Sequence, residues 1–178
     1  MKNSITAHDL SFEPFISEAV ITARVKLLGR NIREHYEGRR PLFIGVLNGA
    51  FVFAADLVRA SGTECEVAFV RLTSYEGTAS SGKITTVLGL DFEVKNRHII
   101  VVEDIVDSGR TLHFFFEELK KLEPASIALA ALLYKPEALQ FPIKIDYLGF
   151  EIPNKFVVGY GLDYNGLCRN LPSIYQKV

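Results

Sequence analysis

Two adjacent acids followed by a short polar turn are the residues of this chain best suited to chemistry. Glu103 and Asp104 come directly after an apolar, β-branched run, and Asp107 stands at the edge of the turn. The turn that opens the next predicted helix consists of Ser108, Gly109, Arg110 and Thr111. Helix amides, hydroxyls and a guanidinium favour a phosphate there, while the acids could accept from ribose hydroxyls or hold hydrated magnesium. An ordinary connection in which Asp107 or Ser108 caps the helix would explain only one of these residues.

Apolar periodicity predicts the strands and helices that must position these residues. Strands are expected at Leu42–Leu47, Cys65–Thr73, Ile84–Leu88, Ile99–Val102, Ser126–Tyr134, Tyr147–Phe150 and Phe156–Tyr160. Helices are expected from Ile16 to Ile32 with Ser17 as cap and Gly38 as stop, from the Asn48-Gly49 turn to about Ala60 before Gly62, and from Thr111 to Leu122. The alternation predicts an α/β fold with a mainly parallel, twisted sheet flanked by helices, and places the acids at a strand's carboxyl end.

The composition predicts one globular domain over residues 1–178. A hydrophobic content of 48% in 178 residues is enough for one substantial core. The 20 Lys and Arg residues balance 21 Asp and Glu, which gives no reason to expect nucleic-acid binding, and the apolar runs are much shorter than the ~20 residues that span a membrane. Cys65 and Cys168 form neither a disulfide framework nor a metal motif, so we expect a reduced, cytoplasmic setting.

Two polar segments at or near predicted strand ends are further candidates for binding. Asn48 and Gly49 follow the first strand, where a glycine lets backbone amides approach a ligand closely, although the pair is also a common plain turn. Ser74 and Tyr75 begin a span of small polar residues that could close over a site as a lid. The residues alone favour an ordinary surface loop for this second segment.

The last third of the chain holds candidates for binding a planar base. Lys135 follows an apolar strand, although a solvated lysine is the usual outcome. Phe156 offers a ring for stacking unless it belongs to the core, and the backbone of Val157 could read a base edge. Asp163 is suited to a hard cation. Arg169 could hold a pyrophosphate bidentately or lie on the surface.

These segments resemble a known family. The run from Glu103 to Thr111 resembles the phosphoribosyl pyrophosphate signature of type I phosphoribosyltransferases, and the segment from Gly149 to Asn165 resembles the purine-binding hood of the hypoxanthine (hypoxanthine-guanine) phosphoribosyltransferases. The resemblance implies the type I fold with a small hood formed by terminal segments. It also implies purine salvage, in which N9 of hypoxanthine, and of guanine, receives the 5-phosphoribosyl group of 5-phosphoribosyl 1-pyrophosphate, giving IMP or GMP and pyrophosphate.

The resemblance also implies roles for matching residues and a requirement for Mg²⁺. Asp107 would be the catalytic base that accepts the proton of purine N7. The 5-phosphate would be held by Asp107, Ser108, Gly109, Arg110 and Thr111. The ribose and pyrophosphate would be held by Asn48, Gly49, Ser74, Tyr75, Glu103, Asp104 and Arg169. The purine would contact Lys135, Phe156, Val157 and Asp163, and Mg²⁺ would bind Glu103, Asp104 and Asp163. A homodimer or homotetramer is the usual assembly of the family.

Two positions depart from the family's pattern. Asn48 stands where Lys is frequent, so only backbone contacts are carried over to it, and Cys168 stands where an aromatic residue is usual. Two alternatives stay open at this point: a transferase that prefers xanthine or guanine, and a regulatory protein of the same fold that senses nucleotides and binds RNA. The balanced charge argues against the second alternative.

Overall fold

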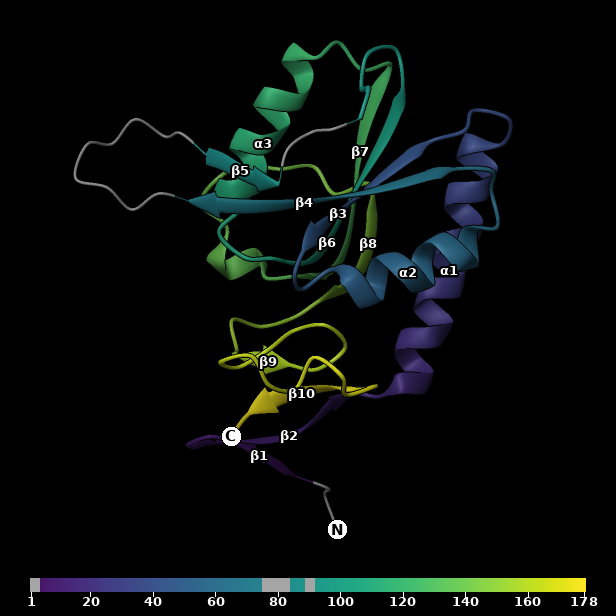
Figure 1. Cartoon of the computed structure of the whole chain (residues 1–178). Helices are drawn as coiled ribbons and strands as arrows, with labels where there is room; N and C mark the ends of the chain where they lie inside the picture. Colours follow the sequence, from purple (N-terminus) through teal and green to yellow (C-terminus); the bar gives the residue numbers. More distant parts are fainter. Residues whose placement is uncertain (1–3, 75–83, 89–91) are drawn as a thin grey trace, which may run out of the picture.

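The computed structural model of this chain describes residues 4–74, 84–88 and 92–178 (Figure 1). The helices are α1 (Glu18–Tyr36), α2 (Phe51–Ser61), α3 (Arg110–Lys121) and the short 3-10 helix η1 (Pro136–Ala138). The strands are β1 (Ile5–Ala7), β2 (Leu10–Ile16), β3 (Leu42–Leu47), β4 (Glu66–Ser74), β5 (Ile84–Leu88), β6 (His98–Val106), β7 (Ser126–Tyr134), β8 (Tyr147–Glu151), β9 (Val157–Val158) and β10 (Ile174–Lys177).

The large sheet has the strand order β5-β4-β3-β6-β7-β8 and is parallel except at one edge. β4, β3, β6, β7 and β8 run parallel to their neighbours, whereas β5 pairs antiparallel with β4. The predicted α/β fold with a mainly parallel sheet is therefore confirmed. Since parallel strands end at the same edge of a sheet, the polar residues at the carboxyl ends of β3, β6 and β7 are brought together.

Helices cover both faces of the large sheet, and β6 lies at its centre (Figure 1). Ile100 and Val102 of β6 pack with α1 and α2, whereas Ile99 and Val101 pack with α3. The buried face of α1 includes Ile21, Val25, Leu28 and Ile32, which follow helical spacing. Each fully buried aliphatic side chain contributes roughly 1.5–3 kcal/mol. The packing makes β6 a firm support for the acids near its carboxyl end.

Both terminal regions form a second, smaller sheet with the order β1-β2-β10-β9. We call this sheet and the loop of residues 159–173 the hood. It lies below the large sheet in Figure 1, at the same end of the molecule as both termini. The predicted hood of terminal segments is confirmed, but β1, β2 and β10 were not predicted. The predicted strand Phe156–Tyr160 is wrong beyond Val158, because positive φ angles at Gly159 (100°) and Tyr160 (51°) are incompatible with an extended strand.

Several predicted boundaries change by a few residues. Ser17 caps α1 as predicted and accepts a hydrogen bond from the Val20 amide at 3.5 Å, but Ile16 ends β2 and is not helical. Gly62 ends α2 in the left-handed conformation with φ 55°. Within the described ranges, no helix is both long and apolar enough to cross a bilayer.

The boundary of β6 matters most for the site. The strand continues to Val106, four residues beyond the predicted end at Val102. Glu103 and Val106 keep their pairing with β7, opposite Ala131 and Tyr134. The expectation that both acids follow the strand is wrong, because they lie within it, and successive strand residues point to opposite faces.

Candidate functional site

The turn after β3 brings the backbone of Gly49 against Asp104 of β6. A methyl group added at Gly49 would lie 1.7 Å from Asp104 Oδ2, so only glycine allows this close approach. The preceding peptide bond, between Leu47 and Asn48, is cis. Two predicted site segments, the Asn48-Gly49 turn and the pair of acids, are thus neighbours although more than fifty positions separate them in the sequence.

The two acids of β6 are both partly buried and differ in their partners. Burial raises the pKa of Asp104 to about 6, against the hydrogen bond from the Ile105 amide to Oδ1 at 2.9 Å and the charge of Arg169, which lower it. Burial and the charge of Asp104 raise the pKa of Glu103 well above its usual range. Glu103 Oε2 is buried without a hydrogen-bond partner among the described residues. Asp104 therefore contacts the Asn48-Gly49 turn, while the side chain of Glu103 lies on the opposite face of β6.

The predicted phosphate turn joins β6 to the amino end of α3. Gly109 is the N-cap residue of α3, with φ 74°, and as a glycine it offers no side chain to cap the helix. The Ser108 hydroxyl accepts from the Arg110 amide at 3.3 Å, and the Ser108 carbonyl accepts from the amides of Gln140 and Phe141 at 3.0 Å. Ser108 therefore caps the first turn of α3 in part, as one of the alternatives expects, although Gly109 occupies the N-cap position itself. The amides of Gln140 and Phe141, which lie outside the helix, fix the position of the turn. The backbone amides at the start of α3 are therefore oriented to bind an anion.

Asp107 and Lys135 form an ion pair across the ends of two neighbouring strands. Lys135 Nζ lies 3.0 Å from Asp107 Oδ2, and the Lys135 amide donates to the Val106 carbonyl at 2.9 Å. Val106 is opposite Tyr134 in the sheet, so the register places the residues that follow them side by side. Lys135 is only 7% exposed, which contradicts the alternative of a solvated lysine. A base and a cation predicted from separate segments thus form one unit.

Phe156 lies in the hood with its ring partly exposed. Its exposed fraction is 43%, so the alternative that it belongs to the core is wrong. Phe12 and Tyr164 flank it, with ring centroids at 6.2 and 5.7 Å. Val157 is buried and pairs with Gln176 of β10. The ring is held from behind by aromatic neighbours and retains exposed surface on which a planar base could stack.

Asp163 and Arg169 form a second ion pair in the hood loop. Arg169 Nη2 lies 2.7 Å from Asp163 Oδ1, and Asp163 Oδ2 accepts from the Gly166 amide at 2.7 Å. Arg169 Nη1 also donates to the Gly161 carbonyl at 2.7 Å. Arg169 is held by these bonds, unlike an ordinary surface arginine. Both oxygens of Asp163 have partners in this structure, so a ligand at this carboxylate would replace at least one of them.

Comparison with known proteins decides the family. Residues 18–165 match the phosphoribosyl transferase domain family. The chain belongs to this family. It is 44% identical to the hypoxanthine-guanine phosphoribosyltransferase of Bacillus subtilis over 168 residues, covering 94% of this chain and 93% of that protein. A crystal structure of the hypoxanthine-guanine phosphoribosyltransferase of Bacillus anthracis aligns with a TM-score of 0.87 and 38% identity, covering 93% of this chain and 96% of the other.

The chain is also similar to a longer protein. It is 44% identical over 160 residues to the bifunctional protein TilS/HprT of Listeria monocytogenes, covering 89% of this chain and 25% of that protein. This chain therefore spans about a quarter of the length of that relative. The resemblance to hypoxanthine (hypoxanthine-guanine) phosphoribosyltransferases predicted from the sequence is confirmed.

The three predicted magnesium ligands do not form a closed cluster in the described part of the chain. Among the residues that the structure describes, no group of three or more His, Cys, Asp or Glu side chains is arranged to hold a metal ion. The charges of Asp163 and Arg169 do act on Asp104, so these three groups share one region. Mg²⁺ commonly keeps several waters and binds one or two carboxylates together with substrate phosphates. Binding of Mg²⁺ by Glu103, Asp104 and Asp163 stays a prediction.

The predicted lid of the transferase begins where the described part of the chain stops. Tyr75 lies outside the described residues, and only the backbone of Ser74, the last residue of β4, is described. Their predicted role in covering the site therefore stays a prediction.

A contact between the hood and the turn after β3 was not predicted. A methyl group added at Gly161 would lie 2.1 Å from the Gly49 carbonyl oxygen. The signal that could have indicated this contact is the Gly159-Tyr160-Gly161 sequence, because paired glycines often mark a close approach of two backbones. The hood thus contacts the Asn48-Gly49 turn as well as carrying Phe156 beside its small sheet.

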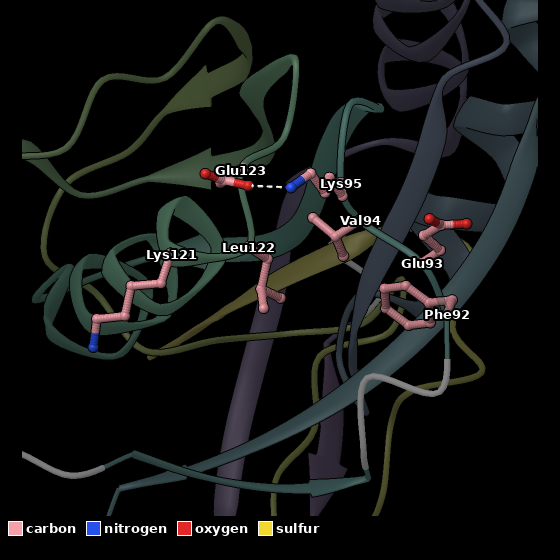
Figure 2. Close-up of a pocket in the computed structure, with 7 residues that line it drawn as sticks. All are labelled: Phe92, Glu93, Val94, Lys95, Lys121, Leu122 and Glu123. Atoms are coloured by element: carbon pink, nitrogen blue, oxygen red, sulfur yellow. Dashed lines mark hydrogen bonds and ion pairs between the residues drawn. The ribbon is translucent and has the colours of Figure 1, made fainter.

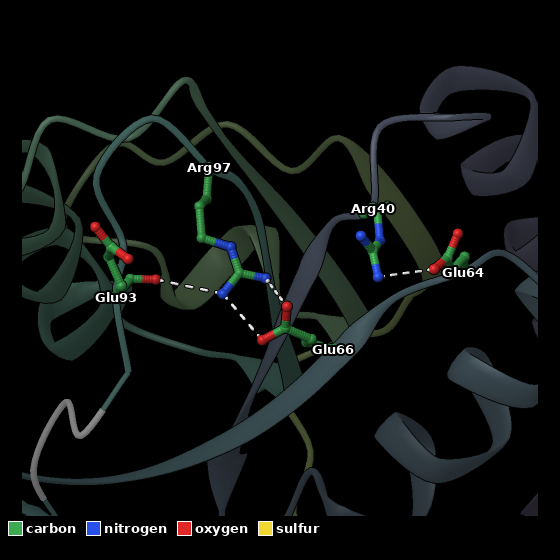
Figure 3. Close-up of polar contacts among 5 residues, drawn as sticks. All are labelled: Arg40, Glu64, Glu66, Glu93 and Arg97. Atoms are coloured by element: carbon green, nitrogen blue, oxygen red, sulfur yellow. Dashed lines mark hydrogen bonds and ion pairs between the residues drawn. The ribbon is translucent and has the colours of Figure 1, made fainter.

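Hollows also occur at the opposite edge of the large sheet. A cavity of about 460 Å³ lies between the segment before β6 and the carboxyl end of α3 (Figure 2). It is lined by Phe92, Glu93, Val94, Lys95, Lys121, Leu122 and Glu123. Nearby, Arg97 makes two bonds to Glu66 at 2.9 and 3.0 Å, and Arg40 pairs with Glu64 (Figure 3). These contacts fasten the amino ends of β4 and β6, and none of the candidate site residues takes part.

Proposed function

We propose that this phosphoribosyltransferase acts in purine salvage as a hypoxanthine-guanine phosphoribosyltransferase. N9 of the purine attacks C1 of 5-phosphoribosyl 1-pyrophosphate, the bond from C1 to the pyrophosphate oxygen breaks, and IMP or GMP and pyrophosphate form. Near full-length similarity to proteins of that name supports the proposal. The assignment of individual residues rests on the geometry described above.

The Asp107–Lys135 pair is the observation that carries the proposal. A 6-oxopurine presents N7 and the oxygen on C6 next to each other on one edge. A carboxylate and an ammonium held 3.0 Å apart match an edge with a proton on N7 and an acceptor beside it. Asp107 accepts the N7 proton as N9 forms its bond, and Lys135 donates to the oxygen on C6. Adenine presents an amino donor at that position, which an ammonium group cannot accept.

The remaining groups hold the substrate on either side of the reacting bond. Ser108 to Thr111 and the start of α3 bind the 5-phosphate, and Phe156 stacks on the purine. Breaking the bond at C1 leaves positive charge on the ribose ring and negative charge on the departing oxygen. Arg169 and the backbone amides of the Asn48-Gly49 turn stabilise the leaving pyrophosphate. Binding energy from the phosphate and the base thus keeps N9 and C1 aligned.

A bound Mg²⁺ ion would supply further positive charge to the pyrophosphate. Asp104 and Asp163 would hold it, with water and substrate oxygens completing its coordination. The region is suited to this role because Asp104 is buried and lies close enough to feel the charge of Asp163. Asp104 must lose its proton to bind a cation, and the cation in turn favours that loss.

Three further parts of the proposal concern the lid, the assembly and the protein's surroundings. Ser74 and Tyr75 are proposed to begin a lid that excludes water from the reacting centre. We propose a homodimer or homotetramer, which sedimentation velocity would measure. The free thiols of Cys65 and Cys168 support a reducing, cytoplasmic setting.

Pyrophosphate release tests the proposed function directly. Purified protein is mixed with phosphoribosyl pyrophosphate, Mg²⁺ and one purine, and both pyrophosphate and nucleotide are measured. We expect turnover with hypoxanthine and guanine, and the ratio of kcat/KM values for hypoxanthine, guanine and xanthine ranks the bases. Absence of IMP formation with a protein that binds phosphoribosyl pyrophosphate would contradict the proposal.

A further inference from the structure

The pyrophosphate half of the site is divided between the large sheet and the hood. Asp104 lies on β6 and Gly49 in the turn after β3, whereas Asp163 and Arg169 belong to the hood loop. The distances between these four groups, and the electrostatic interactions among them, depend on the position of the hood loop relative to α2 and β3. A bond that fixes this placement would influence pyrophosphate binding without touching the ligand.

Tyr160 makes such a bond. Its hydroxyl donates to Asp56 Oδ2 at 2.6 Å, from the hood loop to the middle of α2. Tyr160 is 7% exposed, so the bond is shielded from water on the tyrosine side. The other carboxylate oxygen of Asp56 pairs with Arg59 one helical turn away. A hydrogen bond to an ionised acceptor is stronger than a neutral one.

The hydroxyl remains a donor across the ordinary pH range. Burial, followed by the hydrogen bond and charge of Asp56, raises the pKa of Tyr160. Arg59 is the positive group that acts against this change, and it is itself paired with Asp56. The Tyr160 hydroxyl therefore keeps the proton that it donates to Asp56.

The residue after Tyr160 connects this bond to the site. The Gly161 amide donates to the Arg169 carbonyl at 2.9 Å, and the Gly161 carbonyl accepts from Arg169 Nη1 at 2.7 Å. Gly161 also lies against the Gly49 carbonyl, where an added methyl group would be only 2.1 Å away. One peptide segment thus contacts the guanidinium on one side and the turn after β3 on the other.

Helix α2 links Asp56 to the turn after β3. α2 begins two residues after Gly49, and its Val52 Cβ lies 3.7 Å from the position of an added Gly161 methyl group. Asp56 is on the second turn of that helix. A bond between Asp56 and Tyr160 therefore fixes both the helix that follows the turn and the loop that carries Arg169.

We propose that Tyr160 is a positioning residue whose hydrogen bond to Asp56 sets Arg169 against the Asn48-Gly49 turn in the arrangement that binds pyrophosphate. The inference rests on the proposed function for the identity of the ligand. It assigns a role to Tyr160 and Asp56 that is separate from contact with substrate. Loss of the hydroxyl should weaken pyrophosphate and phosphoribosyl pyrophosphate and should leave purine stacking on Phe156 unaltered.

Tyr160→Phe tests the proposal, because it removes one hydroxyl and keeps the buried ring. Tyr164→Phe is the matched control, since the Tyr164 hydroxyl makes a bond of the same 2.6 Å length to Asp9 within the hood. Magnesium pyrophosphate is titrated into each full-length protein by calorimetry, and KM and kcat are measured for phosphoribosyl pyrophosphate. We expect Tyr160→Phe to raise Kd and KM about tenfold, as loss of a bond to a charged group predicts, with kcat changed less than about threefold and Tyr164→Phe like wild type.

A double-mutant cycle separates positioning from general damage. Asp56→Ala should weaken pyrophosphate as much as Tyr160→Phe, and the double variant should be no weaker than either one. Asp56→Asn, which keeps an acceptor oxygen, should restore most of the affinity. Wild-type affinity in Tyr160→Phe, equal losses in both tyrosine variants, additive losses in the cycle, or no pyrophosphate binding by wild type would each overturn the proposal. Pyrophosphate binding without purine turnover would instead refute the proposed function alone.

Discussion

The ionised Asp104 carboxylate should lower the stability of the ligand-free protein, because burial disfavours its negative charge. Its pKa is raised from 3.8 to about 6, mainly by burial. Raising a pKa by one corresponds to about 1.36 kcal/mol, so the ionised carboxylate lowers the free energy of unfolding by about 3 kcal/mol. Asp104→Asn removes that charge and keeps an oxygen that can accept from the Ile105 amide. Since the new amide is also polar and buried, we expect a net stabilisation of about 1–3 kcal/mol at pH 8.

The pH dependence of the stability difference between wild type and Asp104→Asn tests whether the Asp104 charge causes it. Below about pH 4 both the folded and the unfolded protein keep the Asp104 proton, so wild type and variant should differ little. Between pH 4 and pH 6 the unfolded chain loses this proton before the folded protein does, so wild-type stability falls relative to the variant. Above about pH 6 the difference should reach a plateau. Urea unfolding at five pH values, without Mg²⁺ or substrate, measures this difference.

Two observations would refute the reasoning about Asp104. One is a variant that is no more stable than wild type at pH 8, and the other is a difference that does not change between pH 4 and pH 7. Glu37→Gln removes an exposed carboxylate at the end of α1 and serves as the control that should follow wild type at every pH. The same Asp104→Asn substitution should lower kcat/KM at least a hundredfold, so stability and activity should change in opposite directions.

Four further predictions concern the substrate-binding groups. Asp107→Ala should lower kcat by ~10²–10⁴, the usual contribution of a general base, with calorimetric affinity for phosphoribosyl pyrophosphate retained; unchanged kcat would exclude Asp107 as the base. Competition assays should show strong preference for 6-oxopurines over adenine, and Lys135→Met should reduce that preference at least tenfold, whereas equal wild-type turnover of adenine would contradict the assignment. Phe156→Ala should raise the purine KM about tenfold with little change in thermal midpoint, because the ring is 43% exposed; a large loss of stability would instead indicate a core role. Gly49→Ala should lower kcat/KM at least tenfold in steady-state assays, because the methyl group would lie 1.7 Å from Asp104 Oδ2; wild-type kinetics would show that the close approach is not needed.

The large sheet was predictable because its signals are local. Buried parallel strands appear as continuous apolar runs, and β3, β7 and β8 begin at their predicted residues. The hood strands were not predictable in the same way. β9 has only two residues, and its partner β10 pairs with β2 at the other end of the chain. Pairing over such separations leaves no pattern within a short window.

The sequence predicts candidate site residues one by one, and the structure adds the contacts between them. The family resemblance and the positions at strand ends or in a distinctive loop predicted Asp107, Lys135, Asp163 and Arg169 one at a time, and their roles stay predictions. That Asp107 pairs with Lys135 depends on the register of β6 with β7, which the sequence does not state. The Tyr160–Asp56 bond was missed for a related reason, because an aspartate on an amphipathic helix is ordinarily solvated.

The pairing of β2 with β10 has a consequence for how the protein is made. Phe12, which supports the Phe156 ring, lies opposite Lys177 in the small sheet. During synthesis on the ribosome, the strands that carry the phosphate turn emerge well before β10, and contacts between distant segments are slow to form. The pairing of β10 with β2 would therefore be among the last contacts to form, because the two strands lie far apart in the sequence. The support that Phe12 gives to the Phe156 ring would be completed only with that pairing.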